Sequence, residues 1–421
     1  MQRRQLPNYN KSTPTSEVTP QTVPAKYAHQ TYLQWQARAI DALKMERQLF
    51  NSEGKPVIFP ILLRDACRCS QCVDPSTRQR NFSFFNIPPN VRAIQEATSP
   101  NGDFNIRWEN DIPGFSDHIS TFSLDELVNV LGGKTPAAVS ISDMRTGWDT
   151  KSIAENLVQM PYEEYMSNDA SLFHAIEALR RYGLAFVTKV PSSPESVGKL
   201  VERIGPLRNS FYGSTWDVES KPNADNVAYT HKDLGFHMDL LYMSQVPDFQ
   251  FLHCIRNTCS GGESRFVDTY QARKIMEAEH PEQCEALQDR KVVYEYQNFG
   301  QYYTKRRPVF NRVDGVFWSP PFVGRLADKT QTLKKFLLAC ETFANILERP
   351  NLVYETKMAE DTCVIFQNTR VAHARNAFGV NNGRRWLRGA YLDLQPFLST
   401  RFRLARQLSS DTTSTPSQEQ M

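Results

Sequence analysis

The sequence predicts an α+β protein that is mainly β, a β-sandwich or jelly roll flanked by helices, with a small β-rich domain before it. Three observations support this prediction. Short apolar segments separated by turn residues fill much of the chain up to Asp393, a few amphipathic segments interrupt them, and three cysteines crowd within six residues near the start. Frequent short strands are typical of sandwiches and jelly rolls, and crowded thiols are typical of a small domain built around a metal.

Composition and breakers divide the chain into five predicted parts. Both ends are polar and are expected to be disordered, although a mitochondrial presequence is an alternative for the first 25 or so residues. Gly132, Gly133, Pro136 and Gly147 mark a linker. The predicted parts are a tail (1–30), an N-terminal zinc-binding domain (31–131), the linker (132–160), the larger domain (161–408) and a second tail (409–421).

Periodicity predicts several elements inside these parts. In the small domain, short strands are expected on either side of Pro60, at residues 57–59 and 61–63, and residues 104–108 alternate at the strand period. In the larger domain, apolar residues at helical spacing predict three helices, and a short buried strand follows the glycine that ends the first helix. The expected helices span 169–182, 196–204 and 332–347, and the strand spans 184–187.

Charge and hydropathy disfavour two classes of partner. Lys and Arg number 49 against 46 Asp and Glu, a net charge of +3 without a basic stripe, so we expect no nucleic-acid partner. No apolar run reaches the roughly 18 residues that a membrane span needs. Eight scattered cysteines without a signal peptide indicate an intracellular protein, which we expect in the cytoplasm, with mitochondria as the alternative.

The cysteine cluster predicts a structural zinc site. Cys67, Cys69 and Cys72 have the spacing that wraps a tetrahedral ion, and His118 is the only histidine between the cluster and the linker. Four protein ligands would leave no open position, so the site would be structural. The alternative is three unligated thiols in a loop. The nearby side chains of Arg64, Arg68 and Arg78 would offset the negative charge of the thiolates.

A second set of residues predicts a catalytic iron. His237 and Asp239 form the only His-x-Asp pair in the chain, and residues i and i+2 of a strand share a face. His373 follows the apolar segment 364–366, which predicts a strand that returns beside the first. Two histidines and one carboxylate leave positions on Fe(II) free for a chelating oxo-acid and O₂.

A chelating oxo-acid also needs a cation for its remote carboxylate. Arg385, on the expected strand after His373, could form a bidentate pair with it, whereas Arg384 would face the other way. Ser264 could add a hydroxyl donor. The remaining histidines are not predicted as iron ligands, and His253 is expected on a strand with its hydrogen bonds satisfied locally.

Several ordered motifs resemble the γ-butyrobetaine and trimethyllysine dioxygenases, which are 2-oxoglutarate-dependent, TauD/TfdA-like oxygenases. The resemblance covers roughly residues 56–404 and is closer to the γ-butyrobetaine branch at residues 225–230. Its motifs are Leu-Leu-Arg-Asp-Ala-Cys-Arg-Cys-Ser-Gln-Cys (62–72), Phe-Tyr-Gly-Ser-Thr-Trp (211–216), Leu-His-Cys (252–254), Gly-Gly-Glu-Ser (261–264) and Arg-Gly-Ala-Tyr (388–391).

The resemblance implies a double-stranded β-helix, or jelly-roll, catalytic core and a role for each matching residue. It implies Fe(II), 2-oxoglutarate as cosubstrate with O₂, structural zinc, stimulation by ascorbate, and a homodimer. The implied iron ligands are His237, Asp239 and His373; the 2-oxoglutarate site is Arg385, Ser264 and Leu252; the zinc ligands are Cys67, Cys69, Cys72 and His118; and the substrate site is Tyr212, Trp216, Tyr229, Asn226 and Tyr391.

The aromatic part of that substrate site suits a quaternary ammonium group. Such a group has no N–H to donate, so electron-rich ring faces must recognise it. Tyr212, Trp216, Tyr229 and Tyr391 would form the cage, and Asn226 would contact the carboxylate end of the substrate. The alternative is that these rings only pack the sandwich core.

The expected function is hydroxylation of a small trimethylammonium substrate, with γ-butyrobetaine conversion to L-carnitine first. Leu240 and the segment 317–321 depart from the family pattern, and the segment replaces one that helps hold the acid end of the substrate in the family. The alternatives are trimethyllysine hydroxylation, hydroxylation of another small metabolite, and a non-catalytic zinc-binding interaction protein. The presence of all three iron ligands and Arg385 argues against the last.

Overall fold

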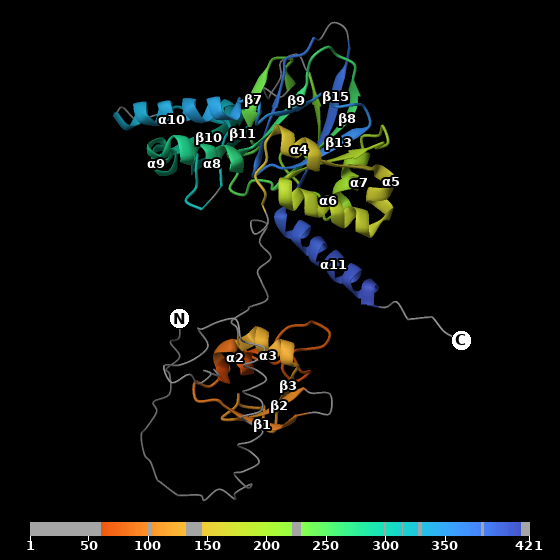
Figure 1. Ribbon diagram of the computed structural model, residues 1–421, viewed down its shortest axis with the longest axis vertical. Helices are drawn as coiled ribbons and strands as arrows, with labels where there is room; N and C mark the ends of the chain where they lie inside the picture. Colours follow the sequence, from red (N-terminus) through yellow and green to blue (C-terminus); the bar gives the residue numbers. More distant parts are fainter. Residues whose placement is uncertain are drawn as a thin grey trace, which may run out of the picture. The chain divides into compact units, whose positions relative to one another are not determined.

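The computed structural model describes residues 60–98, 103–131, 145–220, 229–298, 300–313, 315–326, 331–379 and 383–413. They belong to two compact units, which divide between residues 138 and 139 (Figure 1). The predicted tail at 1–30 and Asn226 lie outside the described residues.

The first unit is a three-stranded antiparallel sheet with short helices. Alternate residues of its central strand, Phe104, Ile106 and Trp108, are buried and pack with Leu63 and Leu127 from two helices. The expected strand at 104–108 is therefore confirmed. The elements are α2 (Pro60–Ala66), η2 (Phe84–Asn86), β1 (Arg92–Thr98), β2 (Phe104–Glu109), β3 (Ile119–Phe122) and α3 (Leu124–Leu131), with sheet order β1-β2-β3.

The strand expected at residues 61–63 is wrong, because these residues belong to helix α2. Pro60 is the first residue of that helix, where its fixed φ angle and missing N–H are tolerated. A run of three apolar residues cannot by itself distinguish a strand from a helix, and here the proline marks a start rather than a break.

The second unit is built on two sheets. The larger has the order β4-β5-β13-β8-β15-β6 and the smaller has the order β12-β9-β14-β7. The larger-sheet strands are β4 (Val158–Pro161), β5 (Leu184–Thr188), β6 (Thr215–Glu219), β8 (Phe249–Asn257), β13 (Thr362–Gln367) and β15 (Arg385–Leu392). The smaller-sheet strands are β7 (Leu234–His237), β9 (Ser264–Asp268), β12 (Tyr354–Thr356) and β14 (Val371–Arg375).

Helices cover the face of the larger sheet that points away from the smaller one (Figure 1). Side chains from α5, α6, α7 and α11 pack there against Ala185, Phe251 and Ile365. Helix α6 matches its prediction at both ends, and Gly183 ends it in the left-handed conformation, with φ of 74°. These helices are α5 (Tyr162–Ser167), α6 (Asp169–Tyr182), α7 (Ser196–Glu202) and α11 (Leu394–Thr413). Helix α4 (Thr150–Asn156) packs elsewhere, where its Ile153 joins Leu184 and Phe266.

Three more helices pack together with a hairpin beside the sandwich. These are α8 (Thr269–Glu279), α9 (Pro281–Asp289) and α10 (Gln331–Leu347), with η5 (Pro320–Phe322) and the antiparallel pair β10 (Lys291–Asn298) and β11 (Gln301–Pro308). Helix α10 confirms the helix expected at 332–347. Helices α8, α9 and α11 were not predicted, because their polar residues weaken their apolar periodicity.

Two predicted boundaries also need correction. Residues 150–161 were assigned largely to the linker, yet they form α4 and β4, and β4 pairs in parallel with β5. Residues 409–413 were assigned to a disordered tail, yet they continue α11. In both places tertiary packing gives a regular structure to a segment whose polar sequence did not predict a helix or a strand.

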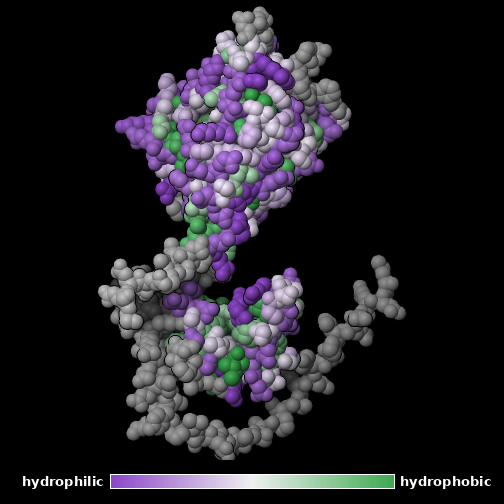
Figure 2. Space-filling model, turned by 90° about the vertical axis from the view of Figure 1, so that its right-hand side faces the viewer, coloured by the Kyte–Doolittle hydropathy of each residue, from purple (hydrophilic) through white to green (hydrophobic). Residues whose placement is uncertain are grey.

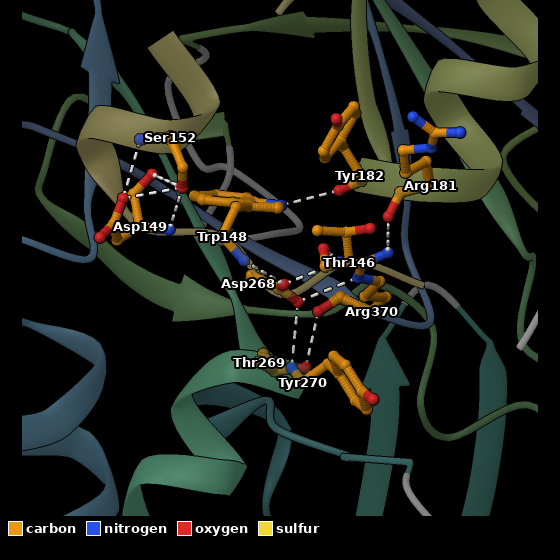
Figure 3. Close-up of polar contacts among 10 residues, drawn as sticks. All are labelled: Thr146, Trp148, Asp149, Ser152, Arg181, Tyr182, Asp268, Thr269, Tyr270 and Arg370. Atoms are coloured by element: carbon orange, nitrogen blue, oxygen red, sulfur yellow. Dashed lines mark hydrogen bonds and ion pairs between the residues drawn. The ribbon is translucent and has the colours of Figure 1, made fainter. Parts of the chain in front are cut away.

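A buried ion pair ties four parts of the second unit together (Figure 3). Arg370, between β13 and β14, donates to both carboxylate oxygens of Asp268 at 3.0 and 2.8 Å, and both side chains are almost fully buried. Arg370 also donates to the carbonyls of Arg181 and Thr146, while the backbone N–H of Trp148 donates to Asp268. The pair therefore fixes the β13–β14 turn against α6, β9 and the segment before α4.

The surface of the second unit is mostly hydrophilic in the view of Figure 2, with apolar residues scattered among polar ones. Among the described residues, no helix has both the length and the apolar character that crossing a bilayer requires.

Replacing Arg370 with Met should destabilise the protein by about 3–5 kcal/mol, because Asp268 would keep a buried charge without its partner. Urea unfolding of the full chain would measure the loss. Arg256→Met is the matched control, since its pair with Glu360 is largely exposed and should contribute under about 1 kcal/mol. Equal effects of the two substitutions would contradict a special role for the buried pair.

His253 should make the fold sensitive to acid. It lies on β8, is fully buried, and both ring nitrogens lack a hydrogen-bond partner among the described residues, so the expectation that it is satisfied locally is wrong. Burial lowers the pKa of His253 to about 4, below the value of about 6.5 in an unfolded chain. The unfolded state then binds the extra proton first, and stability falls as the pH drops from 7 towards 4.

We expect His253→Leu to reduce this loss by about 1–2 kcal/mol between pH 7 and pH 5. Urea unfolding at a series of pH values would measure it. An identical pH dependence in both proteins would refute the assignment.

Candidate active site and metal cluster

The main pocket of the second unit lies between the two sheets. Its empty space, including the open mouth, is ≈740 Å³. Strands β7, β9 and β14 line it from the smaller sheet, and strands β6, β8 and β15 from the larger. The lining includes ten of the residues predicted for iron, cosubstrate or substrate: Tyr212, Trp216, Tyr229, His237, Asp239, Leu252, Ser264, His373, Arg385 and Tyr391. Leu240, at which the sequence departs from its family pattern, lines the pocket as well.

The three predicted iron ligands meet in this pocket. His373 on β14 pairs directly with His237 on β7, and their ring centroids are 4.1 Å apart. The His237 Nε2 atom lies 3.5 Å from Asp239 Oδ1. One ligating atom from each residue lies within 4.8 Å of the others, so the two distant parts of the sequence do converge.

Hydrogen bonds orient His237 and the backbone of Asp239. His237 Nδ1 is 3.0 Å from the carbonyl of Gly235, which it can reach as a donor, leaving Nε2 as the free lone pair. The amide of Asn368, fully buried in the β13–β14 turn, accepts from Asp239 N at 2.7 Å and donates to Asp239 O at 3.1 Å. Asn368 therefore holds the chain in place where β7 ends.

The residue after Asp239 adopts an unusual conformation. Leu240 has φ of 58°, in the left-handed region that L-residues avoid at a cost of roughly 1–2 kcal/mol. This turn places the Leu240 side chain on the pocket wall. Backbone strain of this kind is often found at functional sites, where the surrounding structure maintains it.

The protonation states suit a metal. Burial, the largest single influence, would raise the pKa of Asp239, but the neighbouring groups of His237, His373 and Tyr391 together outweigh it, so the pKa lies below its usual range and the carboxyl is ionised. Burial, followed by the proximity of His237, lowers the pKa of His373 to about 3, so this ring is neutral at pH 7. Neutral imidazole and ionised carboxylate are the forms that bind metals.

These residues fit Fe(II). The buried Nδ1 of His373 has no hydrogen-bond partner among the described residues. Two imidazoles and one carboxylate lining one pocket form the donor set of non-haem iron oxygenases, and an ion held by these three residues would keep positions free for a chelating cosubstrate.

The predicted cosubstrate residues share this pocket. Arg385 on β15 is 6% exposed, and its Nε atom has no hydrogen-bond partner among the described residues. Burial lowers its pKa to about 10, so the guanidinium stays charged at neutral pH. Ser264 on β9 and Leu252 on β8 also line the pocket. Arg384 points elsewhere, to Glu219, as expected.

A second buried cation went unpredicted. Arg375 also lines the pocket, and burial followed by the charge of Arg385 lowers its pKa to about 10. Two guanidiniums in one buried region favour an anion between the sheets. Strand alternation could have identified Arg375, which lies two residues after His373, and Gln250, which lies two residues before Leu252.

The four predicted cage rings line the same pocket. The rings of Trp216 and Tyr391 lie 4.2 Å apart at 30°, and those of Tyr212 and Trp216 lie 6.4 Å apart. A side chain at Gly389 would collide with Trp216, since a Cβ there would lie 2.5 Å from its ring, so glycine permits this approach. Tyr242 and Phe322 add two rings that were not predicted as site residues.

Tyr391 differs from the other three rings. Its hydroxyl donates to Asp239 Oδ2 at 2.8 Å, and burial raises its pKa well above the ordinary value, which keeps the proton on the hydroxyl. Tyr391 was predicted only as a cage residue. Its contacts with both Trp216 and the carboxylate of Asp239 were not predicted.

The predicted zinc ligands meet in the first unit. The Sγ atoms of Cys67, Cys69 and Cys72 lie 3.4, 3.3 and 3.3 Å from Nε2 of His118. A tetrahedral zinc ion with ordinary bond lengths separates sulfur and nitrogen by about 3.6 Å. The hydrogen bond with Cys72 lowers the pKa of Cys67 to about 3 and raises that of Cys72, so a central dication is needed for all thiols to ionise together. The cluster fits zinc.

A carboxylate orients the histidine of this cluster. His118 Nδ1 lies 3.1 Å from Asp111 Oδ2, which leaves Nε2 for the metal, and Arg64 donates to Asp111 Oδ1. Arg64 is fully buried and also donates to Cys72 Sγ at 3.2 Å, so it can offset thiolate charge as predicted.

The family model for taurine catabolism dioxygenase TauD, TfdA family, matches residues 146–391, more than half of the chain. The chain belongs to this family and is an enzyme, a 2-oxoglutarate-dependent dioxygenase. The resemblance inferred from the motifs is thereby confirmed.

Individual relatives differ in their named activities. Dioxygenase str8 of Strobilurus tenacellus is 35% identical over 79% of this chain and 81% of its own length. Gamma-butyrobetaine dioxygenase of Pseudomonas sp. (strain AK-1) is 27% identical over 80% of this chain and 88% of its own. Trimethyllysine dioxygenase of Meyerozyma guilliermondii is 25% identical over 80% of this chain and 88% of its own length.

Asp111→Asn should weaken zinc binding about 10- to 100-fold, because it removes the charge that orients His118 and pairs with Arg64. Competition with a chromophoric chelator would measure the affinity. Asp65→Asn is the control, since Asp65 pairs with Arg80 in the same unit and does not contact the cluster. Loss of zinc from both variants alike would point to general unfolding instead.

Proposed function

We propose that this protein hydroxylates a small trimethylammonium compound, with γ-butyrobetaine as the first candidate substrate and L-carnitine as its product. The observation that carries the proposal is that four aromatic rings share one pocket with the iron triad. Ring faces attract a quaternary ammonium group, with each desolvated contact contributing up to about 2 kcal/mol. Trimethyllysine is the second candidate, because the same rings suit its head group.

In this proposal each pocket residue has a defined task. His237, Asp239 and His373 hold Fe(II), and Arg385 with Ser264 holds the remote carboxylate of 2-oxoglutarate, while Leu252 packs against it. When bound, the iron and the cosubstrate supply the activation of O₂ that hydroxylation of a C–H bond requires. The two sheets form the double-stranded β-helix of the family, and the zinc cluster has a structural role.

The rings then decide which C–H bond reacts. Tyr212, Trp216 and Tyr229 hold the head group, and the apolar side chains of Leu240 and Phe322 exclude water from the wall nearby. In such a reaction the iron and the cosubstrate carry out the chemistry, and the main contribution of the protein is to position the substrate. Asn226, which lies outside the described residues, is proposed to contact the acid end of the substrate.

A neutral small metabolite is the competing candidate. Dioxygenase str8 is more similar to this chain than the carnitine-type relatives reported above. In the segment 317–321, whose sequence departs from the family pattern, Trp318 is buried against Phe343, while Pro320 and Pro321 are exposed. Phe322, the next residue, lines the pocket. An apolar wall at this position suits a substrate without an acid end.

Matched substrates would distinguish the candidates. Purified protein with Fe(II), 2-oxoglutarate and O₂ would be given γ-butyrobetaine, trimethyllysine, or 5,5-dimethylhexanoate, the neutral-head isostere of γ-butyrobetaine, and succinate and product would be followed by mass spectrometry. The cage predicts at least about tenfold higher kcat/KM for the charged head than for the isostere. His237→Ala is the control and should abolish substrate-dependent succinate.

Two results would contradict the proposal. Equal turnover of γ-butyrobetaine and its isostere would contradict the proposed aromatic cage. Turnover of neither γ-butyrobetaine nor trimethyllysine would favour the competing candidate. Iron-dependent turnover that persists in His237→Ala would remove the ligand assignment.

A further inference from the structure

The two oxygens of the Asp239 carboxylate have different surroundings. Oδ1 lies 3.5 Å from His237 Nε2, on the side where the triad converges. Oδ2 accepts a hydrogen bond of 2.8 Å from the hydroxyl of Tyr391, which is 1% exposed. One oxygen is therefore directed at the metal position, and the other is already occupied by a protein donor.

We propose that Tyr391 is a positioning residue for the iron carboxylate: its hydroxyl holds Oδ2 of Asp239 so that Oδ1 alone faces the metal. This inference rests on the proposed function, because it assumes that the triad holds iron. It differs from a cage role, in which the ring face of Tyr391 would matter and its hydroxyl would not.

The backbone and the side chain of Asp239 are thus held separately. Asn368 bonds the N–H and the carbonyl of Asp239, which fixes the position of its Cα atom. That leaves rotation of the carboxylate undetermined, and the Tyr391 hydroxyl determines it. Outer groups of this kind commonly change metal affinity 10- to 100-fold when they are removed.

The same residue connects the substrate pocket with the metal. Trp216 lies against the Tyr391 ring at 4.2 Å, and this approach needs Gly389 on β15. Trp216 itself lines the pocket. A substrate in contact with Trp216 would therefore be linked to Asp239 through the ring and the hydroxyl of Tyr391.

Removing one oxygen atom tests the inference. Tyr391→Phe keeps the ring and its contact with Trp216 but leaves Asp239 Oδ2 without its donor. Fe(II) would be titrated without air in the presence of 2-oxoglutarate, without substrate, by the visible absorbance of the iron–cosubstrate complex. We expect Fe(II) to bind about 10- to 100-fold more weakly than in the unmodified protein, with a shifted absorbance.

Tyr294→Phe is the matched control. It also removes a buried tyrosine hydroxyl, which donates to the carbonyl of Phe317, and Tyr294 does not line the pocket. Thermal unfolding of both variants without metal would report any general loss of stability. We expect Tyr294→Phe to keep the Fe(II) affinity and the absorbance of the unmodified protein.

The remaining outcomes are distinguishable. Unchanged Fe(II) affinity in Tyr391→Phe overturns the positioning role and leaves the proposed function intact. Equal weakening in both variants also overturns it, because the effect would then come from the fold. If the unmodified protein gives no absorbance that depends on His237, the iron assignment itself fails, and the inference fails with it.

Discussion

The catalytic unit depends most on the buried ion pair between Arg370 and Asp268. Removing two charges from water is costly, and this pair offsets that cost with two direct hydrogen bonds and further bonds to four backbone groups. Because Arg370 lies in the β13–β14 turn and Asp268 ends β9, the pair sets where the turn lies against the smaller sheet (Figure 3). Buried charges of this kind specify a geometry more than they add net stability.

The β13–β14 turn supports the candidate iron site at two points. Asn368, two residues before Arg370, holds the backbone of Asp239, and His373, three residues after it, pairs with His237. A displacement of the turn would therefore move a ligand and the support of another ligand together. Metal sites need this degree of support, since small errors in ligand position strongly reduce affinity and activity.

The pocket has opposite chemical character in its two regions. Arg375 and Arg385 place positive charge deep between the sheets, which suits an anionic cosubstrate, while the rings of Tyr212, Trp216 and Tyr391 favour a cation. Asp239 lines the same pocket, with one oxygen facing His237 and the other bonded to Tyr391. This difference in charge would let the proposed positively charged substrate and the negatively charged cosubstrate occupy one pocket without competing.

Much of the candidate site could be predicted from the sequence, because its signals are local in character. The His-x-Asp pair, the crowded cysteines and the helix that Gly183 ends are short patterns with a direct geometric meaning, and the structure places them as those patterns imply. Other features depend on contacts between distant segments. The helical state of residues 61–63, the helices α8, α9 and α11, and the ordering of β4 come from packing that no local pattern records.

The sequence by itself determined which residues could bind metals and cations, because ligand chemistry belongs to the side chain. Only the tertiary structure decided how those residues act on one another: Tyr391 bonds the iron carboxylate, Asn368 holds its backbone, and Arg375 joins Arg385 in the pocket. The physical reason is that a hydrogen bond or a charge contact requires atoms within a few ångströms. Residues more than a hundred positions apart reach that distance only when the two sheets have formed.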